Sequence, residues 1–192
     1  MEAVPRAGFL PPNQRAHADR DAPLSIGHGQ TNSQPTTVRQ MLELLDVQPG
    51  DHVLDVGSGS AWTTALLGHL TGPTGSVTGV ERVPELVTFG AANVFATGMP
   101  WVHVEPAVPG EVGLAAGGPY QRILVSAQAT ALPAELVDQL APRGVLVIPV
   151  SGRMLRVRAD ASGPTVEKHG WYRFVPLVAD PPMGRPAPGR ST

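Results

Sequence analysis

Apolar residues recur along this chain with two alternating spacings, and each spacing predicts a different element. Between residues 36 and 47 they fall at i, i+3, i+4 and i+7, which is the stripe of an amphipathic helix. A proline–glycine pair ends that helix, and residues 52–56 follow as a short apolar strand. The same alternation predicts further helices at 61–70, from 84 onwards and at 133–140, and further strands at 76–81, 101–104, 122–126, 145–150, 154–158 and 172–177.

Buried strands that alternate with amphipathic helices indicate βαβ units, whose strands lie parallel in one sheet with helices on both faces. The last strands have only a turn at 160–163 between them, so we expect an antiparallel edge. The fold class is therefore α/β, open and doubly wound. We expect one domain over residues 1–178, with an irregular first segment at 1–35, and a disordered tail at 179–192.

Composition narrows the class of protein. Of 192 residues, 42% are apolar, which is enough for a sizeable core. The formal net charge is −2 and only 16% of residues are charged, which argues against a nucleic-acid partner held by positive charge. The lack of cysteine excludes a disulfide scaffold, a thiolate metal site and a cysteine nucleophile. Without a long apolar run or a signal-like start, we expect a cytoplasmic protein that does not enter a membrane.

A glycine-rich loop, Gly57-Ser58-Gly59-Ser60, follows the strand at 52–56 and precedes the helix at 61–70. Open α/β sheets bind ligands at this junction, because glycine lets the backbone approach a ligand closely. A tight turn that needs glycine for its geometry alone is the alternative interpretation of the motif.

The surroundings of the loop favour one class of ligand. Trp62 stands where the dinucleotide fingerprint has its third glycine, so its indole would fill the space of a pyrophosphate and disfavours NAD, NADP and FAD. Glu81 ends the next strand, where a carboxylate can accept hydrogen bonds from a ribose diol. Asp55, beside the loop, suits a cationic amino-acid end better than a phosphate. A ligand with a ribose, an ammonium group and no phosphate is S-adenosylmethionine.

Each acid also has a purely structural interpretation. Asp55 could be a hydrogen bonder at the strand end, and Glu81 could be a solvated acid beside Arg82. The pair at this spacing favours the ligand.

The segment 23–35 holds an unusual run, Gly29-Gln30-Thr31-Asn32-Ser33-Gln34-Pro35. With this run, the chain resembles the protein-L-isoaspartate (D-aspartate) O-methyltransferase family over residues 4–177. The other motifs that carry the resemblance are Val4-Pro5-Arg6, Phe9-Leu10-Pro11, residues 49–60, residues 80–86 and residues 173–177.

The chain departs from the family pattern at two places. Ala61 replaces a glycine after the loop, a small change that leaves room for the helix to start. Glu105-Pro106-Ala107 stands where the family has Gly-Asp-Gly, whose aspartate lies by the adenine. The carboxylate has moved by one position, and Pro106 removes a backbone donor, which puts cofactor affinity in question.

The resemblance implies a Rossmann-like class I methyltransferase with a mainly parallel seven-stranded sheet. It implies S-adenosylmethionine as cofactor, S-adenosylhomocysteine as product, and methylation of the α-carboxyl of L-isoaspartyl residues in damaged proteins and peptides. The site residues predicted on this basis are Thr31 and Ser33 for catalysis, and Asp55, Gly57, Ser58, Gly59, Ser60, Glu81, Arg82 and Glu105 for the cofactor.

The chemistry of this reaction agrees with the residues at hand. A carboxylate with a pKa near ~3.9 is ionised at neutral pH, so its methylation needs alignment and exclusion of water rather than a strong base. The hydroxyls of Thr31 and Ser33 can hold a carboxylate without neutralising it. Ser33 has an alternative interpretation as the N-cap of the helix at 36–47. The six histidines lack ligand spacing, so we predict no metal.

Three other functions remain open at this point. One is a carboxyl methyltransferase for a dedicated peptide or small molecule. Another is a module that binds S-adenosylmethionine without turnover, which Pro106 motivates. A nicotinamide oxidoreductase is the least favoured, because of Trp62.

Overall fold

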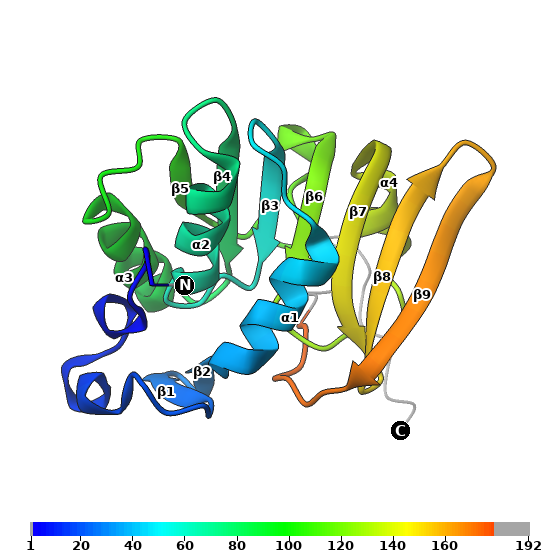
Figure 1. Ribbon diagram of the computed structural model, residues 1–192. Helices are drawn as coiled ribbons and strands as arrows, with labels where there is room; N and C mark the ends of the chain where they lie inside the picture. The colour runs from blue at the N-terminus through cyan, green and yellow to red at the C-terminus, as the bar shows by residue number, and fades with distance from the viewer. Residues whose placement is uncertain (1, 179–192) are drawn as a thin grey trace, which may run out of the picture.

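Seven strands form one sheet in the computed structural model, which describes residues 2–178 (Figure 1). The strand order is β5-β4-β3-β6-β7-β8-β9. Pairs from β5 to β7 are parallel, whereas β8 and β9 add an antiparallel edge. The strands of the sheet are β3 His52–Val56, β4 Ser76–Glu81, β5 Val102–Pro106, β6 Tyr120–Val125, β7 Leu140–Val150, β8 Arg153–Asp160 and β9 Gly163–Trp171.

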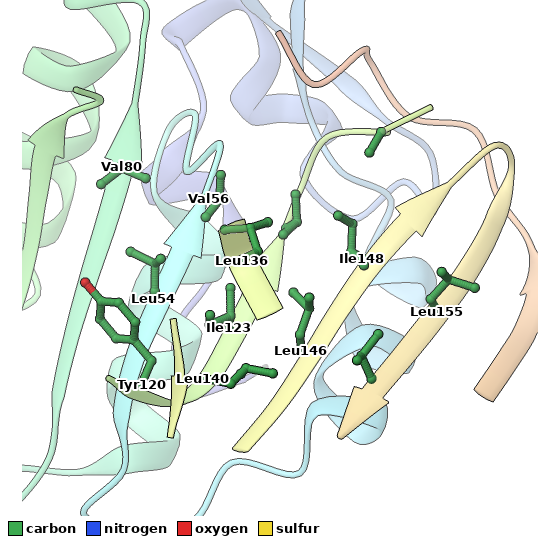
Figure 2. Packing of buried hydrophobic residues seen from close by; sticks show 13 residues of the cluster. Leu54, Val56, Val80, Tyr120, Ile123, Leu136, Leu140, Leu146, Ile148 and Leu155 are labelled. Carbon is green, nitrogen blue, oxygen red and sulfur yellow. The ribbon is translucent and has the colours of Figure 1, made fainter. Parts of the chain in front are cut away.

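Helices cover both faces of this sheet, because successive side chains of a strand point to opposite sides. On one face, residues of α1 to α3 pack with Val53 and Leu124. On the other, Leu136 of α4 packs with Leu54 and Ile123 (Figure 2). The helices are α1 Pro35–Leu45, α2 Trp62–Thr71, α3 Pro84–Phe95 and α4 Ala134–Asp138, with a short 3-10 helix, η3, at Ala115–Gly117.

The N-terminal segment forms its own small layer at one end of the sheet. It contains two 3-10 helices, η1 (Arg6–Phe9) and η2 (Pro12–His17), and a hairpin of β1 (Leu24–Gly27) and β2 (Gln30–Asn32). Figure 1 shows the hairpin at the end toward which β3 and β7 point. The strand order also reverses between β3 and β6, and such a switch point leaves a crevice at the carboxyl ends of the strands.

The predicted fold class is confirmed, and the strands at 52–56 and 76–81 are found with the predicted bounds. The strand predicted at 172–177 is wrong. The last strand, β9, follows the turn directly, and residues 172–177 contribute only an isolated bridge between Pro176 and Gln128. Tyr172 and Phe174 are partly buried against the core cluster that contains Met41 of α1, although they belong to no strand. The first 35 residues are also more regular than expected, and the predicted tail at 179–192 lies outside the described residues.

None of the helices within residues 2–178 is long and apolar enough to cross a membrane.

Candidate active site

A cleft opens at the carboxyl ends of β3, β4 and β6. It contains about 990 Å³ of empty space, counting the open solvent at its mouth, which suits a cofactor-sized molecule. Five segments contribute most of its walls, namely residues 30–33, 56–60, 80–83, 111–113 and 175–178. Segments far apart in the sequence therefore meet at the place predicted from the glycine loop.

The glycine loop forms the floor of this cleft. Gly57 and Gly59 have φ angles of +77° and +55°, a region that favours glycine. A Cβ on Gly59 would lie 3.1 Å from the Cδ1 atom of Ile26 in β1, so glycine allows the hairpin to approach the loop. Ala61, the residue after the loop, has the left-handed conformation with φ +66° and is fully buried.

Glu81 joins the loop to the end of β4 through three backbone donors. Its Oε2 atom accepts the N–H of Gly59 at 2.9 Å, and its Oε1 atom accepts the N–H groups of Arg82 at 2.8 Å and Val83 at 2.9 Å. The residue is 6% exposed and lines the cleft. The interpretation of Glu81 as a solvated acid is therefore wrong.

Asp55 does not line the cleft, and its predicted contact with a ligand stays a prediction. Its side chain is fully buried, and its Oδ2 atom accepts the hydroxyls of Thr63 at 2.9 Å and Thr64 at 2.8 Å. Burial raises the pKa of this carboxyl from the usual 3.8 to about 6, although the two hydroxyls act in the opposite direction. Its Oδ1 atom is buried without a hydrogen-bond partner among the described residues. Asp55 thus supports the loop from behind.

Glu105 does not line the cleft either, and its predicted role as a cofactor ligand stays a prediction. The residue is exposed on the edge strand β5, whereas Ala107 and Glu111 line the cleft in its place. Pro106 leaves the strand pairing intact, since the N–H of Ala107 donates to the carbonyl of Glu81 at 2.8 Å. The Glu111 carboxylate accepts the N–H of Ala115. Sequence reasoning missed Glu111, because it stands in a loop without a recognisable motif.

Thr31 and Ser33 both line the cleft, as predicted, and flank the buried Asn32. The alternative role of Ser33 as helix cap is wrong. The N-cap position of α1 is Gln34, without a side-chain cap, and the carboxylate of Asp21 accepts the N–H and hydroxyl of Thr36 at 2.9 and 2.8 Å. These bonds, the backbone one first, lower the pKa of Asp21.

The polar groups that line the cleft differ in whether they already have hydrogen-bond partners within the protein. The hydroxyls of Ser58 and Ser126 are buried in its wall without a hydrogen-bond partner among residues 2–178. Buried hydroxyls normally find a partner, so these two fit a polar ligand bound in the cleft. Arg82 lies at the rim, where its Nη1 atom donates to the carbonyl of Val178 at 2.9 Å and ties the last described segment to the cofactor side. Ser60 is buried and accepts the amide of Asn32 at 3.1 Å.

Together these features fit S-adenosylmethionine. Gly57 and Gly59 line the cleft beside the carboxylate of Glu81, which lies at the end of the strand next to the loop. In the described residues no group of three acidic or histidine side chains could hold a metal ion.

Comparison with solved structures defines the class of protein. A protein-L-isoaspartate O-methyltransferase aligns with 94% of this chain and 61% of its own, with a TM-score of 0.83 and 21% identity. A putative protein-L-isoaspartate O-methyltransferase from Plasmodium falciparum, in complex with S-adenosyl-L-homocysteine, aligns with 93% of this chain and 88% of its own, at a TM-score of 0.79 and 26% identity. The chain thus has the α/β fold of the S-adenosylmethionine-dependent methyltransferases.

Sequence comparison gives the family. The profile of protein-L-isoaspartate(D-aspartate) O-methyltransferase matches residues 1–181. The protein-L-isoaspartate O-methyltransferases of Aeropyrum pernix and Methanopyrus kandleri are 48% and 41% identical over 157 and 185 residues, or 82% and 94% of this chain. The chain belongs to the protein-L-isoaspartate (D-aspartate) O-methyltransferase family. It spans 60% of the Aeropyrum protein and 82% of the Methanopyrus protein.

Proposed function

We propose that this protein transfers a methyl group from S-adenosylmethionine to the α-carboxylate of L-isoaspartyl residues in damaged proteins and peptides. One observation carries the proposal: a single cleft joins the glycine loop and Glu81 with the hydroxyls of Thr31 and Ser33. The glycine loop and Glu81 suit a ribose-containing cofactor, and the two hydroxyls suit the carboxylate of a substrate. Family membership supports both halves.

On this proposal, the cofactor side consists of Gly57, Ser58, Gly59, Ser60, Glu81 and Arg82. The carboxylate of Glu81 accepts hydrogen bonds from the ribose diol, while its three backbone bonds hold it in place. When bound, S-adenosylmethionine supplies a methyl group made electrophilic by the adjacent sulfonium. The chain contributes binding, orientation and exclusion of water.

Thr31 and Ser33 are the proposed catalytic residues. Their hydroxyls donate to the substrate carboxylate and orient one of its oxygens toward the methyl group, without taking its charge away. A carbon–oxygen bond forms as the carbon–sulfur bond breaks, which gives a methyl ester and S-adenosylhomocysteine. The following amide nitrogen of the substrate can then displace methanol to form a succinimide, which reopens partly to normal aspartate.

A methyl-transfer assay tests the proposal. Labelled cofactor is incubated with an isoaspartyl peptide and with its aspartyl twin of the same sequence. We expect label on the isoaspartyl peptide alone. Transfer to neither peptide, with cofactor binding intact, would favour a dedicated substrate or a module that binds the cofactor without turnover.

We further propose that the protein acts in the cytoplasm on aged proteins, where damaged aspartyl sites accumulate.

A further inference from the structure

The guanidinium group of Arg6 is buried where the N-terminal segment meets the cleft. The residue is 6% exposed, and its guanidinium carbon lies 5.4 Å from the centre of the Trp62 ring. Its donors reach five backbone carbonyls, which are those of Ala18 at 3.3 Å, Arg20 at 2.9 Å, Ala22 at 2.9 Å, Asn32 at 3.0 Å and Ser33 at 2.9 Å. One side chain therefore ties residues 18–22 to the last residue of β2 and to Ser33, which follows it.

Asn32 continues this connection to the cofactor loop. Its Oδ1 atom accepts the Nε–H of Arg6 at 2.7 Å, and its Nδ2 atom donates to the hydroxyl of Ser60 at 3.1 Å. Because arginine can only donate, this bond fixes which end of the amide faces Ser60. The carbonyl of Ser60 in turn accepts the amide of Asn93 in α3 at 3.0 Å.

The strand that this network holds has little other support. β2 has three residues and pairs with β1 alone, through a register that shifts near Gly27. A two-stranded hairpin is at best marginally stable by itself, so its position depends on contacts with the rest of the protein. Thr31 and Asn32 are successive residues of β2, so their side chains point to opposite sides of the strand, and Ser33 follows directly with its carbonyl bound to Arg6.

We propose that Arg6 and Asn32 are positioning residues that, with Ser60, fix Thr31 and Ser33 relative to the cofactor loop. The inference rests on the proposed function, because it takes the two hydroxyls as the binding site of the methyl acceptor. Arg6 acts through Asn32 and Ser33 and does not line the cleft.

Lysine cannot reproduce this arrangement. It has three donors on one nitrogen, whereas arginine presents five donors in a planar fork. Arg6→Lys retains the charge and loses several of the carbonyl contacts, so the strand shifts. A displacement of ~1 Å at a reacting group can cost ~10²-fold in rate.

The test compares Arg6→Lys with Arg15→Lys. Arg15 is an exposed arginine of the same N-terminal segment, and its Nε atom donates within that segment to the carbonyl of Leu10 at 3.1 Å. We measure methyl transfer to an isoaspartyl peptide at saturating cofactor, cofactor affinity by calorimetry, and thermal melting. Arg6→Lys is expected to lower kcat by about 10–100-fold with nearly unchanged cofactor affinity. Arg15→Lys is expected to behave as wild type.

A second variant keeps the inference testable if Arg6→Lys does not fold. Asn32→Ser removes the amide between Arg6 and Ser60 and leaves the carbonyl contacts of residues 18–22 in place, so kcat should fall while the protein stays folded. If the wild type is active and both Arg6→Lys and Asn32→Ser keep wild-type kcat, the proposed positioning role is refuted and the proposed function still stands. If the wild type binds the cofactor and methylates neither twin peptide, the proposed function is refuted, and the positioning role that rests on it is refuted too.

Discussion

Glu81→Gln is a nearly isosteric change that separates the ribose-binding role of this side chain from its support of the loop. In the wild type, both carboxylate oxygens accept backbone N–H groups. A glutamine can keep its oxygen toward Arg82 and Val83, but its NH₂ group then faces the N–H of Gly59. That donor loses its acceptor in a buried site, which costs roughly 1–3 kcal/mol.

The same change weakens the proposed bond to the ribose. Hydrogen bonds to a charged acceptor contribute roughly 1.5–3 kcal/mol, so cofactor affinity should fall about 10–100-fold. Isothermal titration with S-adenosylmethionine gives the affinity, and urea denaturation gives the free energy of unfolding.

Glu85→Gln is the matched control, because Glu85 is exposed in the first turn of α3 and does not line the cleft. It should leave both quantities close to their wild-type values. A Glu81→Gln protein with wild-type cofactor affinity would refute the ribose assignment, even if its stability had fallen as expected.

Three further changes have distinct expected outcomes. Ser33→Ala should lower methyl transfer by on the order of 10²-fold without shifting the melting temperature, whereas Asp21→Ala should lower the melting temperature and leave turnover largely intact; the opposite pattern would make Ser33 structural after all. The folded-state pKa of Asp55, about 6, lies above the usual 3.8, so the folded protein binds more protons between these values and loses stability as the pH rises through them. Asp55→Asn should therefore stabilise the cofactor-free protein at pH 7.5, by at most about 3 kcal/mol, and the gain should shrink below pH 6 in denaturation curves; a constant difference would contradict the raised pKa. Replacement of Glu105-Pro106-Ala107 by Gly-Asp-Gly should tighten cofactor binding in calorimetry, and unchanged affinity would show that Glu111 or backbone groups serve the adenine instead.

Local patterns were sufficient for the fold class, for two central strands of the sheet and for the position of the cleft. The strands at 52–56 and 76–81 are short apolar runs bounded by turn residues, and the glycine loop has to lie at the end of the first of them. The prediction of a strand at 172–177 was wrong because an apolar run indicates that residues are buried but does not determine whether they pair in a sheet.

Long-range contacts explain what the sequence could not predict. The helix cap of α1 comes from Asp21, which precedes Thr36 by fifteen residues, outside any local capping pattern. The sequence does not show in which direction a carboxylate at a strand end points. The carboxylate of Asp55 points toward α2, where it accepts the hydroxyls of Thr63 and Thr64. The partners of Arg6 lie between twelve and twenty-seven residues away, so its role was visible only in the fold.

Repair of a damaged peptide is the most direct test of the whole account. A purified isoaspartyl peptide is incubated with the protein and S-adenosylmethionine, and its isoaspartyl, succinimidyl and aspartyl forms are separated by chromatography over time. The account predicts that the isoaspartyl form declines while the succinimide and then the normal aspartyl peptide accumulate, and that omission of the cofactor abolishes the change. An isoaspartyl fraction that stays constant, in a protein that demonstrably binds the cofactor, would contradict it.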